Sequence, residues 1–515
     1  MMALPTYFER NAEAAATLIQ GFDPVFVAER LEVEVIGIIF DAAAAASTES
    51  RAALDMIVRL TARIYPTLAI VGLRAPSTYV AQLKRLAKSI NPRIDLLDRM
   101  ENATRIAVFG ETQVPTVRKA VGSTWFVGSD NWFMRLSRNA PVGAGNSANP
   151  LAAGAASCVA AANVFRAIFA TELGKDLLDD ELWFSLLDMR EVDSASANPQ
   201  LTRLVLRDVH LAGAGAIGNG FLWALSRLTW RGTLHIVDPE TITDSNLQRY
   251  VMAVASDRGK TKAIRSASWM PRAKGRTVES RVMDWATHIS AQQHVADTVV
   301  SALDSARVRI EVQASLPRQV FNGWTQGGEA GVSRHRFLGT MACLACLYLP
   351  HGSALNEDQM VARALKLPDD EPTVRDIRQR LQQNKPTERA YLERIAAASG
   401  APIGKLLAYE NQPLSSLYVG GVCGGAIMEF HAAALDAHAD VPMAFQSAFA
   451  GIALAAELAR PTRLPHTVTQ IDLLGTFPPR PGRNQEKSTT PPCICVDEDF
   501  IDVYRAKYPT ETVGS

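Results

Sequence analysis

The chain has 515 residues, of which 47% are hydrophobic and 21% charged, and 53 Lys and Arg residues balance 53 Asp and Glu residues. The length suffices for about two to four domains. The neutral balance predicts no nucleic-acid partner, because such partners usually require a basic surface. The N-terminal stretch MMALPTYFERNAEAAA is too charged for a signal peptide, and six cysteines are too few for a disulfide framework, so we expect a cytoplasmic protein.

The first third alternates short apolar runs with helical segments, a pattern typical of an α/β domain. Four runs are predicted as buried strands: EVEVIGIIFD, TLAIVGL, RIDLLD and RIAVFG. None is followed by a glycine-rich phosphate turn. We therefore predict an α/β unit without a working nucleotide site in residues 1–200, with a boundary near the polar stretch DSASANPQLTR.

The stretch HLAGAGAIGNGFLWALSRL carries a Gly-x-Gly-x-x-Gly turn. A strand leads into it, a helix is predicted over 219–232, and a second strand ends at Asp238. This order is that of a nucleotide-binding βαβ unit. We expect Gly213 to permit the tight turn, Gly215 to let backbone amides approach phosphates, and Gly218 to let helix and strand pack closely. Asp238 is placed to bind a ribose, so a nicotinamide-dependent dehydrogenase fits these residues equally well.

Three further stretches decide between nucleotides: TDSNLQRYV, GKTKAIRSA and TVVSALDSARVR. With the glycine turn, they resemble the adenylyltransferase fold of ubiquitin-activating enzymes and of bacterial enzymes that activate sulfur-carrier proteins. The resemblance covers residues 203–310, with all four motifs in the family's order and spacing. It implies that the nucleotide is ATP, because hydride transfer has no need for this polar cluster.

The resemblance implies roles for individual side chains. Adenylation brings an anionic triphosphate to an anionic carboxylate, so cationic groups must neutralise the charge. Arg249 and Lys262 match those groups, with Lys262 favoured over Lys260 by register. Asp304 matches the acid that positions Mg²⁺, and Asn246 matches a polar ligand near the triphosphate. The alternative is that the two cations are solvated and that Asp304 caps a helix.

Two cysteine pairs have spacings suited to a metal. Cys343-x-x-Cys346 and Cys493-x-Cys495 together offer four thiolates for a structural Zn²⁺. The related activating enzymes use a similar arrangement, although the second pair here has one intervening residue instead of two. The alternative is four small apolar side chains in a core.

Cys423 lies between these pairs, in YVGGVCGGAIMEF, after a charged stretch predicted as a helical insert over 354–410. Related enzymes carry the thiol that accepts the activated protein in this region, and a helix N-terminus near it would lower the thiol pKa. The alternative is a small residue in tight packing. Cys158, in an Ala-rich helix, is predicted to lie in the core, and the apolar stretch VPMAFQSAFAGIALAAELA is predicted to be a buried helix rather than a membrane span.

In the first half, the stretch NPLAAGAASCVAAANVFRAIF also resembles members of this superfamily in which a degenerate adenylation domain precedes the active one. The resemblance thus implies an α/β protein with two Rossmann-like adenylation units. Residues 1–200 form the degenerate unit and residues 201–515 the active unit, with a helical insert and cysteine region over 354–440. In this superfamily an arginine from the other half often completes the site, and Arg135 and Arg138 are among the candidates here. A homodimer is also allowed.

The predicted function is ATP-dependent adenylation of the C-terminus of a ubiquitin-like protein, which is then carried as a thioester and passed to a ubiquitin-conjugating-like enzyme. Similar bacterial cassettes have been linked to antiviral defence. Three alternatives remain: adenylation alone, for a sulfur-carrier or peptide substrate; an NAD-dependent oxidoreductase; and a non-catalytic scaffold. The polar cluster around Arg249 argues against the scaffold.

Overall fold

The structure is a computed structural model, and it describes residues 24–113, 123–173, 178–326, 328–349, 357–368, 370–383, 385–417, 442–475, 477, 482–489 and 492–509. The chain divides into two compact units. The larger comprises Met1–Leu349 and Val441–Ser515, and the smaller comprises Pro350–Asp440. The larger unit contains two sheets, one in each half.

The first half folds around an eight-stranded sheet with the order β3-β2-β1-β4-β5-β6-β7-β8. Its strands are β1 (Val35–Asp41), β2 (Thr67–Leu73), β3 (Asp95–Leu97), β4 (Arg105–Phe109), β5 (Thr124–Asp130), β6 (Phe133–Ser137), β7 (Glu181–Ser185) and β8 (Arg190–Glu191). Strands β1 to β5 pair in parallel, and β6 to β8 continue the sheet antiparallel. The four predicted strands correspond to β1–β4, whereas β5–β8 were not predicted.

The second half repeats this topology in a seven-stranded sheet with the order β11-β10-β9-β12-β13-β14-β15. Its strands are β9 (Leu204–Ala212), β10 (Trp230–Val237), β11 (Arg276–Arg281), β12 (Thr298–Ser301), β13 (Gln319–Gln326), β14 (Glu329–His335) and β15 (Val468–Asp472). The first five are parallel and the last two antiparallel. Each sheet thus begins with five parallel strands in the order 3-2-1-4-5, as predicted for two Rossmann-like units.

Helices connect the strands of both sheets. In the first half they are α2 (Pro24–Glu32), α3 (Ala42–Ala46), α4 (Thr48–Ile64), α5 (Ser77–Ile90) and α6 (Leu151–Ile168). In the second half they are α7 (Ala216–Arg227), α8 (Asp244–Leu247), η2 (Ala255–Asp257), α9 (Lys262–Ser268), α10 (Trp285–Ala291), α11 (Ala306–Ala314), η3 (Ala345–Leu347), α17 (Ala444–Ala459), η7 (Ile494–Val496) and α18 (Glu498–Lys507). The helix predicted over 219–232 therefore ends at Arg227, and Gly232 lies inside β10 at a register irregularity.

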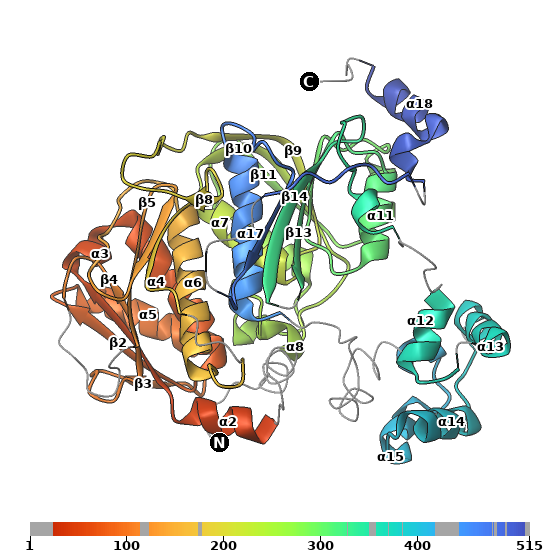
Figure 1. The fold of residues 1–515 in the computed structure, drawn as a ribbon, viewed down its shortest axis with the longest axis horizontal. Helices are drawn as coiled ribbons and strands as arrows, with labels where there is room; N and C mark the ends of the chain where they lie inside the picture. Colours follow the sequence, from red (N-terminus) through yellow and green to blue (C-terminus); the bar gives the residue numbers. More distant parts are fainter. Residues whose placement is uncertain are drawn as a thin grey trace. The chain divides into compact units, whose positions relative to one another are not determined.

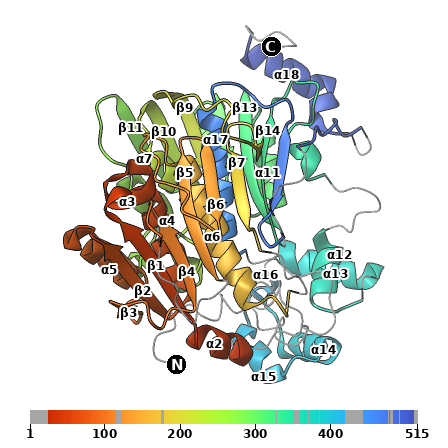
Figure 2. The same cartoon turned by 60° about the vertical axis from the view of Figure 1, so that its left-hand side comes forward.

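Four of these helices form a layer between the two sheets (Figures 1 and 2). α4 and α7 follow the first strand of their own sheet, and α6 and α17 precede the last antiparallel strands, so the layer pairs equivalent helices of the two halves. Their side chains belong to one large apolar core. α6 is long and apolar enough to cross a membrane, but 94% of its 18-residue apolar stretch is buried in this layer. Burial accounts for its composition, as it does for that of α17.

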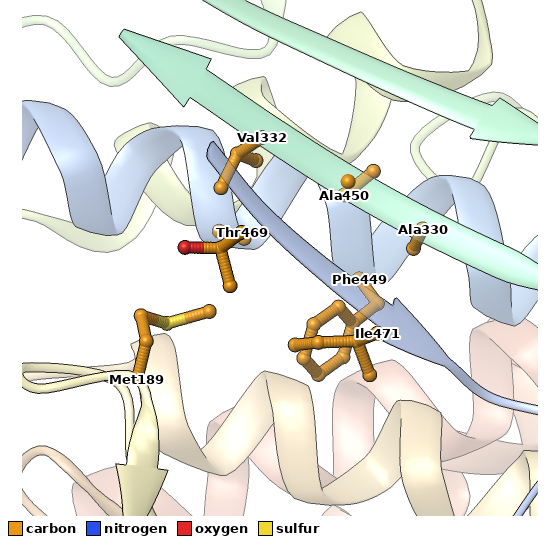
Figure 3. A pocket seen from close by; sticks show the side chains of 9 residues that line it. Met189, Ala330, Val332, Phe449, Ala450, Thr469 and Ile471 are labelled. Atoms are coloured by element: carbon orange, nitrogen blue, oxygen red, sulfur yellow. The ribbon is translucent and has the colours of Figure 1, made fainter. Parts of the chain in front are cut away.

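A second contact between the halves lies at the edge of this core, where Met189 of the first half approaches α17, β14 and β15 (Figure 3). The side chains of Phe449, Val332 and Ile471 line a small apolar hollow there. Because it has no room for a water molecule, we interpret it as a packing seam and not as a ligand site.

The smaller unit is helical where it is described. Its elements are α12 (Glu357–Ala364), α13 (Glu371–Gln382), α14 (Arg389–Ser399), α15 (Ile403–Leu406), η4 (Leu407–Tyr409) and α16 (Leu414–Leu417). They surround an apolar core of their own that includes Leu365, Ile377 and Leu392. In the chain this unit stands between β14 and α17, where the first half has only the loop between β6 and α6.

Candidate active site

The glycine turn joins β9 to α7 at the carboxyl end of the second sheet. Gly213 has φ of +90°, and a Cβ atom there would lie 2.8 Å from the carbonyl oxygen of Ala302. A Cβ atom on Gly218 would lie 2.5 Å from the carbonyl oxygen of Gly213, so the helix and the turn touch there. At Gly215, by contrast, the nearest neighbour of an added Cβ is the Tyr250 hydroxyl at 3.5 Å. The turn therefore leaves room above Gly215, at the N-terminus of α7, where backbone N–H groups attract anions.

Asp238 fastens the end of β10 to this turn. Its carboxylate accepts hydrogen bonds from the backbone N–H of Ala214 at 2.8 Å and of Glu240 at 2.9 Å. The residue is 6% exposed, and burial raises its pKa, against the opposing charge of Lys262. An acid held at this position can accept hydrogen bonds from a ribose bound beside the turn.

Lys262 is the first residue of α9 and is only 6% exposed. Its ammonium group forms an ion pair with Glu240 and lies 5.4 Å from the centre of the Tyr250 ring. Burial lowers the pKa of Lys262, but Tyr250, Asp238 and Glu240 outweigh that effect and raise it above its usual value. The lysine is therefore a buried, permanent cation beside the glycine turn.

Lys260 differs from Lys262 in both respects. Its side chain is 49% exposed, and its ammonium group pairs with Asp257 at 2.9 Å, away from the acid at the end of β10. The sequence favours Lys262 over Lys260 only by its position relative to the motif. In the structure the two lysines also differ in exposure and in their acidic partners.

The SNLQR segment forms α8 and the turn after it. The Asn246 side-chain oxygen accepts a hydrogen bond from the Thr243 N–H at 3.1 Å, which closes the first turn of α8. Arg249 lies near Tyr250: burial raises the pKa of Tyr250, and the charges of Lys262 and Arg249 oppose that rise. Tyr250 and Glu240 were not predicted as site residues, although Tyr250 directly follows Arg249 in the sequence and Glu240 lies two residues beyond Asp238.

Asp304 follows the end of β12 and is exposed. The N-cap of α11 is Ser305, whose hydroxyl accepts from the Val308 N–H, so Asp304 is not the capping residue. Two residues earlier, the Ala302 N–H donates to the Ala212 carbonyl at 2.9 Å, which places this strand end next to the glycine turn. Asp304 is thus available to a cation at the carboxyl edge of the sheet.

The four cysteines predicted to bind metal meet in one buried cluster, outside the nucleotide site. The Sγ atoms of Cys343 and Cys346 are 3.8 Å apart, and those of Cys343–Cys493 and Cys346–Cys495 are each 3.5 Å apart. Tetrahedral zinc with bonds of ~2.3 Å requires sulfur separations of ~3.8 Å. These distances are too long for disulfides and fit a tetrahedral ion, so the cluster could bind zinc.

A second group of potential ligands was not predicted. Asp208 on β9 contacts the Nε2 atoms of His210 and His235, each at 2.9 Å, and His210 Nδ1 lies 2.9 Å from His288 Nε2. The His210 and His235 rings are stacked with an interplanar angle of 7°. Nitrogen lone pairs lie in the ring plane, so parallel rings cannot direct theirs to one ion. We interpret this group as a hydrogen-bonded network in which the hydrogen bonds from His210 and His235 hold the pKa of Asp208 well below its usual range.

The remaining predicted residues lie elsewhere. Cys423 falls in 418–441, outside the described residues. Cys158 is fully buried in α6, as predicted. Arg135 and Arg138 form ion pairs with Asp130 and Asp180 within the first half. Two arginines of the first half that donate to the segment after α8, Arg59 and Arg63, lie on α4.

Comparison with known proteins places this geometry in a family. Residues 190–414 match the ThiF family, and residues 39–170 match Prokaryotic E2 family C. "Uncharacterized protein y4jF" of Sinorhizobium fredii (strain NBRC 101917 / NGR234) is 40% identical over 514 residues, which cover 98% of each chain.

Two solved structures are more distant. E. coli MccB with MccA-N7isoASN is 14% identical over 55% of this chain and 65% of that chain, with a TM-score of 0.32. PaaA is 17% identical over 25% of this chain and 42% of that chain, with a TM-score of 0.22. Both alignments span less than two thirds of the solved chain, and the assignment does not rest on them.

The glycine turn, the acid after β10 and the buried lysine define a nucleotide-binding α/β enzyme. They lie in the part of the chain that matches the ThiF family. The chain belongs to the same family as its full-length relative y4jF, and its two matched domains place it in the superfamily of ubiquitin-activating enzymes and sulfur-carrier adenylyltransferases. The chemistry of that superfamily is adenylation of a carboxylate with ATP and Mg²⁺.

Proposed function

We propose that this chain activates the C-terminus of a ubiquitin-like protein, first as an acyl-adenylate and then as a cysteine thioester. The observation that carries the proposal is the buried cation Lys262 beside Asp238 and the glycine turn. A ribose acid, a phosphate turn and a charged lysine in one place suit ATP better than a nicotinamide dinucleotide.

In the adenylation step, the terminal carboxylate oxygen attacks the α-phosphorus of ATP, a bond forms between them, and pyrophosphate leaves. Lys262 and Arg249 neutralise the charge of the pentacoordinate phosphorus, and the N–H groups at Gly215 and the start of α7 hold phosphate oxygens. Asp304 positions Mg²⁺, which shields the negative charge of the triphosphate. Asn246 contributes a polar contact near the triphosphate.

In the transfer step, the Cys423 thiolate attacks the acyl carbon, the bond from that carbon to the AMP oxygen breaks, and AMP leaves. The acyl group then passes to the cysteine of a separate conjugating enzyme. A separate enzyme is required although residues 39–170 match an E2 family. Cys158 is the single cysteine in that range, it is fully buried, and burial raises its pKa.

We assign residues 1–200 to the degenerate unit and 201–515 to the active unit. At the end of β1, where the second sheet has its glycine turn, the first has Asp41, whose carboxylate accepts from the N–H groups of Ala44 and Glu111 and from the Thr112 hydroxyl. A carboxylate that already occupies these donors repels phosphate and leaves it no partners.

The four-cysteine cluster is proposed to hold a structural zinc ion that joins the segment after β14 to the segment before α18. Its cysteines lie in an apolar cluster with Phe337 and Tyr504, away from the nucleotide site. We place the protein in the cytoplasm, in a conjugation pathway that acts in antiviral defence. Since one chain contains both α/β halves, which resemble the two subunits of a dimer, a homodimer is not needed to complete the site.

The test mixes the full chain with Mg·ATP and candidate ubiquitin-like proteins, followed by intact mass and non-reducing gels. Wild type should form an adduct of partner mass that thiols remove, and both Cys423→Ala and Asp304→Ala should lose it. Cys423→Ala should still release pyrophosphate, whereas Asp304→Ala should not. Pyrophosphate release without an adduct in wild type would establish adenylation alone, and binding of NADH but not Mg·ATP would refute the proposal.

A further inference from the structure

Two arginines of the first half reach across the helical layer into the second half. Both are on α4, one turn apart, and both donate to backbone carbonyl oxygens at the end of α8 and in the turn after it. Arg63 donates from Nε to Leu247 at 3.1 Å and from Nη2 to Tyr250 at 2.6 Å and Ala253 at 2.5 Å. Arg59 donates from Nη1 to Val251 at 2.9 Å.

The segment they hold, residues 247–253, has no regular hydrogen-bonding ladder. It consists of the end of α8 and a turn, so its carbonyls cannot all be satisfied within one helix. Arg63 is fully buried, and without it the carbonyls of Leu247 and Ala253 would lose a hydrogen-bond donor, while that of Tyr250 would keep the Ala253 N–H. One guanidinium therefore fixes three points of the chain at once.

The same segment is fastened from the other side by Asn219 of α7. Its side-chain oxygen accepts from the Met252 N–H at 3.2 Å, and its side-chain nitrogen donates to the carbonyls of Ala214 and Gly215 at 3.0 and 2.9 Å. The segment is thus held between the first half and the glycine turn, and it carries Arg249 and Tyr250.

We propose that Arg63 is a positioning residue of the nucleotide site: it orders residues 247–253 and thereby presents Arg249 and Tyr250 to the triphosphate. This inference rests on the proposed function, because that function assigns Arg249 to ATP. Arg63 does not act on ATP itself, since its donors are used on carbonyls, including that of Arg59. The degenerate half then contributes to the active site indirectly, because its Arg63 fixes the backbone of residues 247–253.

Arg63→Met tests the proposal by removing the donors while keeping an unbranched, helix-compatible side chain. The matched control is Arg227→Met. Arg227 lies at the same interface, where it pairs with Asp55 of α4 at 2.6 Å, and its other hydrogen bonds go to Trp223 and Ser226, outside the 247–253 segment. A general loosening of the interface would affect both variants, whereas loss of positioning affects only Arg63→Met.

Two measurements on the full chain decide the outcome. In hydrogen exchange without nucleotide, peptides covering 247–253 should exchange at least tenfold faster in Arg63→Met than in wild type and be unchanged in Arg227→Met. In calorimetric titration with Mg·ATP, the Kd should rise at least tenfold in Arg63→Met and less than threefold in Arg227→Met. Arg63→Lys, which retains charge and length, should lie between wild type and Arg63→Met.

Unchanged exchange in Arg63→Met, or equal losses in both variants, would overturn the inference. If wild type binds no Mg·ATP, the proposed function fails, and the exchange measurement still decides whether Arg63 orders the segment. If Arg63→Met does not fold, Arg63→Lys carries both measurements, because its single ammonium cannot reach three carbonyls at once.

Discussion

Acidification should lower the free energy of unfolding of the second half, because His288 is protonated more readily in the unfolded chain than in the folded protein. His288 on α10 is fully buried, and its neighbours are His210, His235, Arg281 and Asp208. Burial and then the charges of the histidines and Arg281 lower the pKa of His288 from 6.5 to about 4, against the attraction of Asp208. The folded state therefore keeps His288 neutral at pH values where the unfolded chain protonates it.

The sign follows from proton linkage. Between pH 6.5 and about 4 the unfolded state binds more protons than the folded state, so stability falls as the pH falls through this window. The complete loss is at most ~3.4 kcal/mol, at ~1.36 kcal/mol for each pH unit that separates the two pKa values. From about pH 7.5 to about pH 5.5 the expected loss is ~1.3 kcal/mol, or an apparent Tm lower by roughly 2 °C.

The assay compares denaturation of wild type and His288→Gln at these two pH values, followed by the total tryptophan fluorescence, to which Trp285 contributes with its ring 5.6 Å from that of His288. His288→Gln should lose ~1.3 kcal/mol less than wild type on acidification, whatever its stability at neutral pH. The control is His294→Asn, which removes an exposed histidine just after α10 and keeps a residue that tolerates its positive φ. Equal pH dependence in wild type and His288→Gln would refute the reasoning.

Three other substitutions test the site and the cysteine cluster. Lys262→Gln should weaken Mg·ATP binding in calorimetry by roughly tenfold to a hundredfold, since it removes a charged hydrogen bond worth ~1.5–3 kcal/mol. The control Lys260→Gln should change the Kd less than about threefold. Equal effects of the two substitutions would mean that the burial of Lys262 is irrelevant to nucleotide binding. Cys346→Ser should lower the zinc content measured by elemental analysis and the Tm together, and an unchanged metal content would exclude zinc from this cluster. Gly218→Ala should abolish Mg·ATP binding and lower the Tm, because its Cβ would lie 2.5 Å from the turn carbonyl, whereas Gly404→Ala, with nothing within 4 Å, should do neither.

The elements that could be predicted from the sequence are those defined by local patterns. β1–β4 are short apolar runs, and the turn between β9 and α7 is recognisable from three glycines within six residues. β5 and β6 were missed because their apolar runs are broken by the polar hairpin residues Ser129–Asp130–Asn131, and β8 has only two residues. Two Rossmann-like units were predicted, but the antiparallel direction of the last strands of each sheet was not.

The candidate site shows the same limit. Gly213, Gly218 and Asp238 could be assigned because turn geometry and strand order restrict what such residues can do. The proximity of Glu240 and Tyr250 to Lys262 depends on how three connecting segments fold back on the sheet. Arg63 is separated from Tyr250 by 187 positions, and no local pattern marks it. Long-range contacts of this kind are decided by tertiary packing.

The two halves show how one topology can supply different parts of a site. The end of β1 has Asp41, which satisfies its neighbours' donors internally, while the equivalent end of β9 has a turn that leaves amides free for phosphate. In the layer between the two sheets, α4 of the first half contacts α7 of the second half. There Asp55 accepts from Trp223 and Arg227 of α7, and its pKa is lowered to about 2 because Arg59 and Arg227 outweigh its burial. These hydrogen bonds fix α4 against α7, and a fixed α4 allows Arg63 to order residues 247–253.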